Sequence, residues 1–543
     1  MSQERVEALS SPCAVVAEAS ATHLAIQGPI AWLADRPSTF AIALLIVATG
    51  VRLVLMNAIG FGNDEAYTLV GARDLHLSYF DHPPLHVWFA HLASRTFGET
   101  SSVRLPTVLL FAGTGWLIFA LTRDMFGPAA GLWALAALNM TPFFTVSAGG
   151  WIVPDGPLSF LLLAVIRTLE PVLFRREGEV ATEGARRAWL LAGFCLGLAE
   201  LSKYTAAFAG MGLLGFLATS PRQRRWLRHP APYAAGIVAL LTVSPAIVWN
   251  AQHHWVSFAF QGDRGLPRTG LHLVQVLAMV AGEFALLSPW IAAPATLALA
   301  DACRGRCGER GRLMAWLAVP AIAFFSIAPL WSARGLPHWP MPGWLFAFPL
   351  LGRWLAAGRR RWLSPPAWAA GSALVFVAVL SIGVVVAKVG LPWTTPSEKG
   401  SEDPTLEAFP WTALRDSSAL RAMHADFVVT TRWMDAGKIA VALGKGMPVA
   451  VFSDDPRQFA FAPPLTSSLG HDAAIVVPSR LLDETLARVR PYFVSIDGPE
   501  HVWFGRMGRP ELDLAVVHAH HLRQSYPNPY EPLASPTAGG PSR

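Results

Sequence analysis

Long apolar segments recur along most of this chain, and they limit its fold more than any other feature. A bilayer core about 30 Å thick needs roughly 20 apolar residues per helix. Windows of that kind predict about eleven spans, near residues 39–59, 103–121, 128–146, 155–174, 188–201, 204–218, 231–250, 271–299, 313–331, 338–356 and 367–391. Only 15% of the residues are charged, against about a quarter in soluble domains. The sequence therefore predicts a mainly α-helical, polytopic membrane protein.

The arginines indicate how these spans are oriented. Arginine clusters follow the fourth, sixth, eighth and tenth spans, at 175–187, 222–228, 304–312 and 353–361. Cytoplasmic loops retain Lys and Arg, so these clusters predict a cytoplasmic N-terminus and an extracytoplasmic C-terminal region. Because the net charge of +6 is gathered in these loops, we expect no nucleic-acid partner.

The composition changes after the last predicted span. DFVVT, PVAVF, residues 474–478 and YFVSI predict strands, and RWMDAGKIAVAL predicts a helix. Four parts are therefore expected: a disordered cytoplasmic tail (1–38), a transmembrane catalytic domain (39–391), a small α/β extracytoplasmic domain (392–523) and a disordered tail (524–543).

Polar residues gather in the loops opposite the arginine clusters. The stretch FGNDEAYTLVGARDLHLSYFDHPPLHVW (61–88) follows the first span directly, and 149–156, 201–204, 249–265 and 332–340 are assigned to the same side. Charges at a membrane edge are costly unless they face a cavity or one another. Their collection on one side indicates a common site.

Carboxylates are the first candidates for chemistry there. Asn63 or Asp64 is expected to cap a helix over EAYTLVGARDLHL, which would place Asp64 and Glu65 at its positive end. A capped interfacial helix without catalytic function would look the same. Asp155, just outside the fourth span, and the rigid turn at 81–84 favour a site in which a carboxylate acts as general base.

Isolated cations complete the pattern. Lys203, Arg264 and Arg334 are expected to face an anion such as a lipid phosphate, which arginine binds bidentately. Lys203 could instead snorkel to the interface or pair with Glu200. Two roles fit His338. It is either a metal ligand or, as is more common for a histidine at a membrane interface, a hydrogen-bonding residue in the wall of the site. No complete metal-ligand set is evident in the sequence, so we expect the site to work without a metal ion or another cofactor.

Six segments in order resemble a known family. They are NDEAYTLVGARDLHLSYFDHPPL, SVRLP, VPDGPL, LAELSKYTA, WNAQHHWVSFAFQ and HWPMPGW, within roughly residues 40–350. The set resembles the bacterial branch of the dolichyl-phosphate-mannose protein mannosyltransferase superfamily, which includes aminoarabinose transferases. The turn before Pro83-Pro84 reads Asp81-His82, where those transferases usually have lysine, so the aminoarabinose donor is not favoured.

The resemblance implies a GT-C fold and an inverting glycosyltransferase in a bacterial inner membrane. Asp64 would be the catalytic base with Glu65 beside it, and Asp155 the second acidic residue. Lys203 and Arg264 would face the phosphate of a polyprenyl-phosphate sugar. The other expected substrate-binding residues are Tyr67, His82, His338 and Trp339.

Two other functions fit parts of the pattern. A transporter or flippase of lipid-linked sugars would also have many spans and cavity charges, but it should show repeated halves with broken helices. A non-catalytic glycan-binding protein would tolerate the loss of Asp64. The favoured reading is transfer of a sugar to a lipid, polysaccharide or protein acceptor on the periplasmic face.

Overall fold

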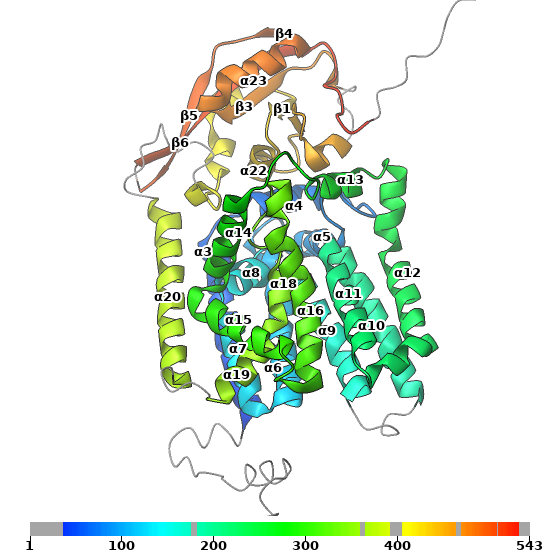
Figure 1. Cartoon of the computed structure of the whole chain (residues 1–543). Helices are drawn as coiled ribbons and strands as arrows, with labels where there is room; N and C mark the ends of the chain where they lie inside the picture. Colours follow the sequence, from blue (N-terminus) through cyan, green and yellow to red (C-terminus); the bar gives the residue numbers. More distant parts are fainter. Residues whose placement is uncertain are drawn as a thin grey trace, which may run out of the picture.

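The computed structural model describes residues 36–174, 182–358, 364–390, 404–462, 468–507 and 509–531. A bundle of long helices forms its larger part, and a small mixed sheet lies at one end of the bundle (Figure 1). The protein is thus mainly helical with a small sheet, as predicted. Residues 1–35 and 532–543, which make up most of the two expected tails, lie outside the described residues.

Each of the eleven apolar segments is helical in the structure. The helices are α3 (Pro37–Ala58), α6 (Leu105–Phe126), α7 (Pro128–Asn139), α9 (Asp155–Phe174), α10 (Thr182–Ser202), α11 (Ala207–Thr219), α12 (Pro230–Gln252), α14 (Leu273–Leu287), α15 (Pro289–Cys303), α16 (Gly308–Ile327), α18 (Met341–Leu345), α19 (Ala347–Ala356) and α20 (Pro365–Val389). Within the described residues, six helical segments are long and apolar enough to cross a membrane, and two bent pairs raise that number to eight if each pair is one span. The count of eleven spans stays a prediction.

Two predicted spans are broken by sharp bends. The segment 271–299 divides into α14 and α15. The chain bends by 107° between them, at Ser288, which has a positive φ of 70°. The segment 128–146 bends by 79° after α7, where the chain continues as a π-helical turn, η2 (Phe143–Ser147), and α8 (Ala148–Gly150). The π-helical turn begins after Pro142, which lacks the N–H group that a regular helix requires.

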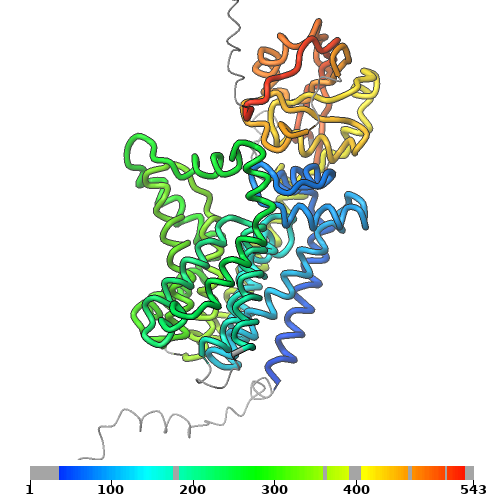
Figure 2. Tube along the Cα trace, turned by 90° about the vertical axis from the view of Figure 1, so that its right-hand side faces the viewer, coloured from blue at the N-terminus to red at the C-terminus, as the bar shows by residue number. Residues whose placement is uncertain are grey.

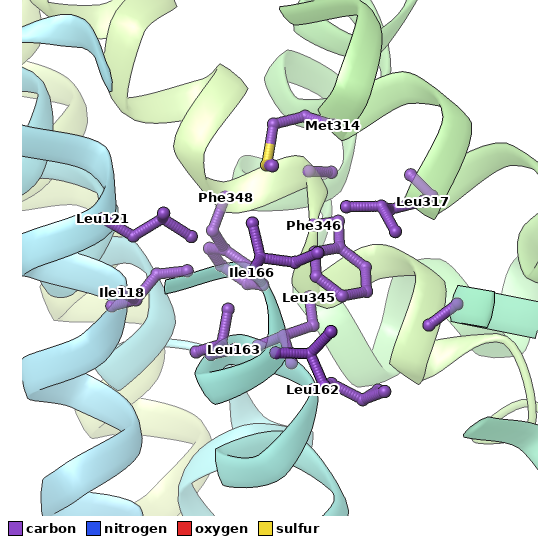
Figure 3. Packing of buried hydrophobic residues seen from close by; sticks show 14 of the residues in the cluster. Ile118, Leu121, Leu162, Leu163, Ile166, Met314, Leu317, Leu345, Phe346 and Phe348 are labelled. Carbon is purple, nitrogen blue, oxygen red and sulfur yellow. The ribbon is translucent and has the colours of Figure 1, made fainter. Parts of the chain in front are cut away.

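Close packing of apolar side chains holds the bundle together. Figure 3 shows Ile118 of α6, Leu163 of α9 and Phe348 of α19 meeting in one buried cluster. Met314 and Leu317 of α16 join it from the opposite side. This core lies between helices that are distant in sequence, so it fixes the ends of those helices relative to one another.

The sheet has six strands in the order β2-β1-β3-β6-β4, with β5 also paired to β6. They are β1 (Phe427–Thr430), β2 (Val449–Val451), β3 (Ala473–Pro478), β4 (Phe493–Ile496), β5 (Glu500–Arg506) and β6 (Arg509–Leu522). β1 pairs in parallel with β2 and β3, whereas β6 is antiparallel to its three neighbours. The four predicted strands coincide with β1 to β4; β5 and β6 were not predicted.

Shorter helices lie between the long helices and around the sheet. They are α4 (Asn63–Gly71), α5 (Leu85–Phe97), α13 (Val256–Asp263), α17 (Pro329–Ser332), α21 (Ser418–Ala422), α22 (Trp433–Leu443) and α23 (Leu482–Val489). Figure 2 shows α4 and α5, in blue, at the end of the bundle that faces the sheet region. α22 packs against α4 so closely that a Cβ on Gly437 would lie 2.9 Å from the Tyr67 nitrogen, so glycine is required there.

Residues 524–531 belong to the segment expected as a disordered tail, yet they are packed. The Tyr530 ring stacks on Phe80 with 4.3 Å between centroids, and Tyr526 stacks on Phe452 at 4.7 Å. Aromatic contacts of this kind add to the apolar area that the rings bury. The segment thereby links the sheet region to the loop that follows α4.

Candidate functional site

The helix α4 carries the Asp-Glu pair, but its ends differ from those expected. Its N-cap is Gly62, where Asn63 or Asp64 was predicted, and it ends at Gly71 instead of continuing to residue 77. The backbone nitrogen of Gly62 donates to Glu65 Oε2 at 3.0 Å, so the glutamate side chain satisfies a free N–H at the helix start. Asp64 and Glu65 therefore differ in environment although both lie in the first turn of α4.

Glu65 faces the protein interior. Its side chain is fully buried and forms a two-pronged ion pair with Arg104, whose Nε donates to Oε1 at 2.7 Å. Arg104 also donates to the carbonyl oxygens of Met56, Ile59 and Gly60, and Glu65 Oε1 accepts from the Ile152 nitrogen at 3.1 Å. Since these partners occupy both carboxylate oxygens, we infer that Glu65 positions the loop between α3 and α4.

Asp64 faces the other way and is exposed. Asp81, His82 and Arg457 lie close enough to interact electrostatically with this carboxylate, and we call the space in front of it the recess. Burial in this recess raises the pKa of Asp64 above its usual range; Asp81 and Glu65 add to this, while His82 and Arg457 oppose it. An accessible carboxylate with a raised pKa has the properties of a general base.

A buried hydrogen-bond chain forms one wall of the recess. The Tyr67 hydroxyl donates to Asp81 Oδ1 at 3.0 Å, and Arg457 from the sheet region pairs with Asp81 Oδ2 at 3.1 Å. Tyr67 also accepts from the Gln458 nitrogen at 3.0 Å, and the Arg457 guanidinium lies 3.9 Å above the Trp433 ring. Tyr67 thus reaches Asp81 and the 457–458 segment, so the sheet region helps to build the site.

Asp155 and Lys203 form a second buried pair. Lys203 Nζ donates to Asp155 Oδ1 at 2.9 Å and to Oδ2 at 3.1 Å. Asp155 is the first residue of α9, so the positive end of the helix also favours its anionic form. Lys203 thus pairs with Asp155. This geometry matches neither of the two alternatives considered from the sequence, which were pairing with Glu200 and snorkelling to the interface.

His82, His338 and Arg264 complete the cluster. Burial lowers the pKa of His82, and both His82 and His338 interact electrostatically with Asp155 and Lys203. Arg264 lies 4.3 Å from the centre of the Phe260 ring and 5.8 Å from that of Trp339. Burial lowers the pKa of Arg264, and so does its neighbour Arg457. An anion between these two guanidinium groups would relieve their repulsion.

Six candidate residues named from the sequence therefore belong to one cluster linked by electrostatic interactions: Asp64, His82, Asp155, Lys203, Arg264 and His338. Sequence reasoning missed Arg104, Asp81 and Arg457 as site residues. Arg104 lies in SVRLP and Asp81 in the turn before the double proline, so both could have been found from the quoted motifs. Arg457 has no such signal.

The chain is similar in sequence to several known proteins. The family described as dolichyl-phosphate-mannose-protein mannosyltransferase matches residues 81–249. Lipid A galacturonosyltransferase RgtD of Rhizobium johnstonii is 24% identical over 311 residues, 56% of this chain and 63% of that protein. An undecaprenyl phosphate-alpha-4-amino-4-deoxy-L-arabinose arabinosyl transferase of Serratia proteamaculans is 27% identical over 268 residues, 47% of this chain and 46% of that protein. The alignments span less than two thirds of either relative.

Solved structures with a similar fold cover most of this chain. The crystal structure of ArnT from Cupriavidus metallidurans in the apo state covers 88% of this chain and 98% of its own, with a TM-score of 0.60 at 14% identity. The same protein bound to undecaprenyl phosphate gives 0.58 at 16% identity, covering 90% and 98%. The chain therefore has an ArnT-like GT-C fold. In this GT-C fold, loops from one end of the helical bundle and residues of the sheet region surround the same recess.

Proposed function

We propose that this GT-C protein transfers a sugar from a polyprenyl-phosphate donor to an acceptor hydroxyl, with inversion at the anomeric carbon. Asp64 is the observation on which this proposal rests. It is an accessible carboxylate of raised pKa, and its neighbour His82 also interacts electrostatically with Lys203 and Arg264. The printed names of the relatives, a lipid A galacturonosyltransferase and an aminoarabinose transferase, support this class of reaction.

The reaction requires three functions, which different residues supply. Asp64 takes the proton of the acceptor hydroxyl, whose oxygen attacks the anomeric carbon. The bond between that carbon and the phosphate oxygen breaks, and its electron pair leaves with the polyprenyl phosphate. Arg264 and its neighbour Arg457 stabilise the departing anion. Asp155, held ionised by Lys203, stabilises the positive charge that develops on the sugar ring.

The membrane arrangement is part of the proposal. Eleven spans, with the N-terminus in the cytoplasm and the region after α20 in the periplasm, would place the recess at the outer face of a bacterial inner membrane. The arginine clusters support this orientation because they lie in alternate loops. The division into parts at 1–38, 39–391, 392–523 and 524–543 is proposed on the same basis.

An apolar cavity between α3 and α20 supports a lipid as one substrate. Its volume is about 380 Å³, and its lining includes Met56 of α3, Phe376 and Leu380 of α20, and Glu407. Burial raises the pKa of Glu407, and the nearby Asp64 charge adds to this shift. An alkyl or prenyl chain in the cavity would therefore bring its headgroup toward the recess that contains Asp64.

Filling this cavity is expected to weaken turnover of the lipid substrate. Gly383 lines the cavity, and a Cβ built there meets no atom within 4 Å, so Gly383→Phe places a ring in the open space without a clash. We expect kcat/KM for that lipid to fall roughly tenfold, about 1.4 kcal/mol. Gly371→Phe is the matched control, because Gly371 is equally open on the same helix but does not line the cavity. Equal effects of the two variants would argue against a lipid chain in the cavity.

The proposed activity is tested by mass spectrometry. Membranes with and without the protein, in one matched background, are compared for extracted glycolipids and envelope glycoproteins. A sugar-sized mass that requires both the protein and a polyprenyl-phosphate donor is the expected result, and it would identify sugar and acceptor. Identical profiles, with folded protein and donor present, would favour transport or binding over transfer.

A further inference from the structure

Histidines and aspartates meet at the end of the sheet, outside the recess described above. His518 and His520 are two residues apart on β6, so their side chains emerge on the same face. They continue the row of Leu514 and Val516, which lie in the apolar cluster beneath that face. The row changes from apolar residues to histidines within one strand.

Carboxylates flank the histidine pair on both sides. Ala473 of β3 pairs with Ala519, so Asp472 lies opposite His520 in the same antiparallel register. On the other side of β6, Ser495 of β4 pairs with His520, and the Asp497 nitrogen donates to the His518 carbonyl at 2.9 Å. The register of the three strands thus brings two imidazoles and two carboxylates together.

Three ligand atoms converge on one point. His520 Nδ1 is 3.0 Å and His518 Nε2 is 3.2 Å from the same oxygen, Oδ2, of Asp472. The three atoms all lie within 4.8 Å of one another. The other oxygen, Asp472 Oδ1, accepts the backbone N–H of His521 at 2.9 Å, which fixes the direction of the carboxylate.

Asp497 faces the opposite nitrogens of both rings. His520 Nε2 is 3.0 Å and His518 Nδ1 is 3.9 Å from Asp497 Oδ2. A neutral imidazole that donates its proton to Asp497 presents a lone pair toward Asp472. Two nitrogen lone pairs and a carboxylate oxygen at these distances require positive charge between them, supplied by extra protons or by a metal ion.

We propose that Asp472, His518 and His520 bind a divalent transition-metal ion of the zinc class. Two imidazole nitrogens and a carboxylate are a common ligand set for such an ion, and the Asp497 carboxylate behind the His520 ring matches the arrangement that orients metal-binding histidines. Asp497 is then a positioning residue. The side chains of the three ligands are 18–28% exposed, so the ion has access from solvent and water completes its coordination.

The ion would connect β3 and β6 at the end of the sheet, with Asp497 holding β4 to the same cluster. None of these residues belongs to the proposed transfer site, so the inference does not depend on the proposed function. It is also compatible with sugar transfer that needs no metal. The alternative occupant is a set of protons shared among the same four side chains, and Zn²⁺ titration distinguishes these protons from a metal ion.

The test measures zinc binding to the full-length protein, purified in detergent without a histidine tag. Isothermal titration with Zn²⁺ is expected to show one site that His520→Ala weakens at least tenfold. Asp497→Asn is expected to keep the stoichiometry and weaken affinity roughly 10- to 100-fold. The matched control is His501→Ala, which removes a His–Asp pair of 2.9 Å elsewhere on the sheet and should leave binding unchanged.

Two further measurements use the unmodified protein and so do not depend on the folding of a variant. Zn²⁺ should raise the unfolding temperature of the unmodified protein. Co²⁺ in place of zinc should give the visible absorption of a low-coordinate site with nitrogen and oxygen ligands. A wild-type protein that neither binds Zn²⁺ nor is stabilised by it would overturn the proposal and favour the proton network. Equal loss of binding in His520→Ala and His501→Ala would also overturn it, because it would indicate unspecific capture by surface histidines.

Discussion

Asp64→Asn is expected to lower kcat for sugar transfer by roughly 10²- to 10⁴-fold, the contribution typical of a general base. Asparagine keeps the shape of the side chain and the start of α4, because the N-cap contact is made by Glu65 and not by Asp64. It removes only the ability to accept the proton. The measurement is the initial rate of labelled sugar transfer by purified protein with a fixed polyprenyl-phosphate donor.

Asp74→Asn is the matched control for this prediction. Asp74 follows the end of α4 and is exposed, and its contact with the Tyr79 hydroxyl is made through the backbone carbonyl. The same chemical change there should leave kcat within about twofold, since surface substitutions away from special features change stability by only about 0.5 kcal/mol. A normal rate for Asp64→Asn would exclude Asp64 as the base, whatever the control does.

The pH dependence of the wild-type rate follows from the same carboxylate. Asp64 accepts a proton only when it is ionised, and burial raises its pKa above the ordinary aspartate value of about 3.9. Transfer should therefore fail as the pH drops through the raised pKa, at a higher pH than an ordinary aspartate would give. Arg457 opposes the shift. Arg457→Gln should therefore move the acid limb of the kcat/KM profile to still higher pH.

The helical part of the fold could be predicted because membrane burial has a simple sequence signal. A run of about 20 apolar residues satisfies both the bilayer and its own backbone hydrogen bonds as a helix. Bends within such runs have weaker signals. Ser288 interrupts the segment 271–299 with a positive φ, which serine seldom adopts, so apolar length alone predicted one continuous helix there.

The site could be predicted only as a set of residue types on one side of the membrane. The sequence places Asp64 and Glu65 side by side, and only the packing against Arg104 separates a buried structural carboxylate from an accessible one. Arg457 reaches Asp81 from a segment 376 residues later, a contact with no local pattern. The strand β6, by contrast, does carry a signal: the alternation in ELDLAVVHAHHL has the period of two expected for a strand.

Arg104→Met is expected to lower the free energy of unfolding by about 3–5 kcal/mol, because it leaves the Glu65 charge buried without its partner. The same change also removes the donor for the carbonyl oxygens of Met56, Ile59 and Gly60, which join α3 to α4. The measurement is the unfolding free energy in detergent, followed by intrinsic tryptophan fluorescence against denaturant. Arg187→Met is the control. Arg187 and Glu183 form an i,i+4 pair that is largely exposed, so its loss should cost at most about 0.5 kcal/mol.

A double-mutant cycle separates the ion pair from the rest of the Arg104 contacts. Glu65→Gln alone should destabilise the protein, because the Arg104 charge then stays buried without a counter-charge. Combining Glu65→Gln with Arg104→Met removes both charges, so the double variant should be more stable than the sum of the single effects predicts, by about 0.5–3 kcal/mol. Additive losses would mean that Arg104 acts mainly through the three carbonyl oxygens. If the folded Glu65→Gln variant also lost transfer as completely as Asp64→Asn, Glu65 would take part in the chemistry, because a positioning role leaves the base itself in place.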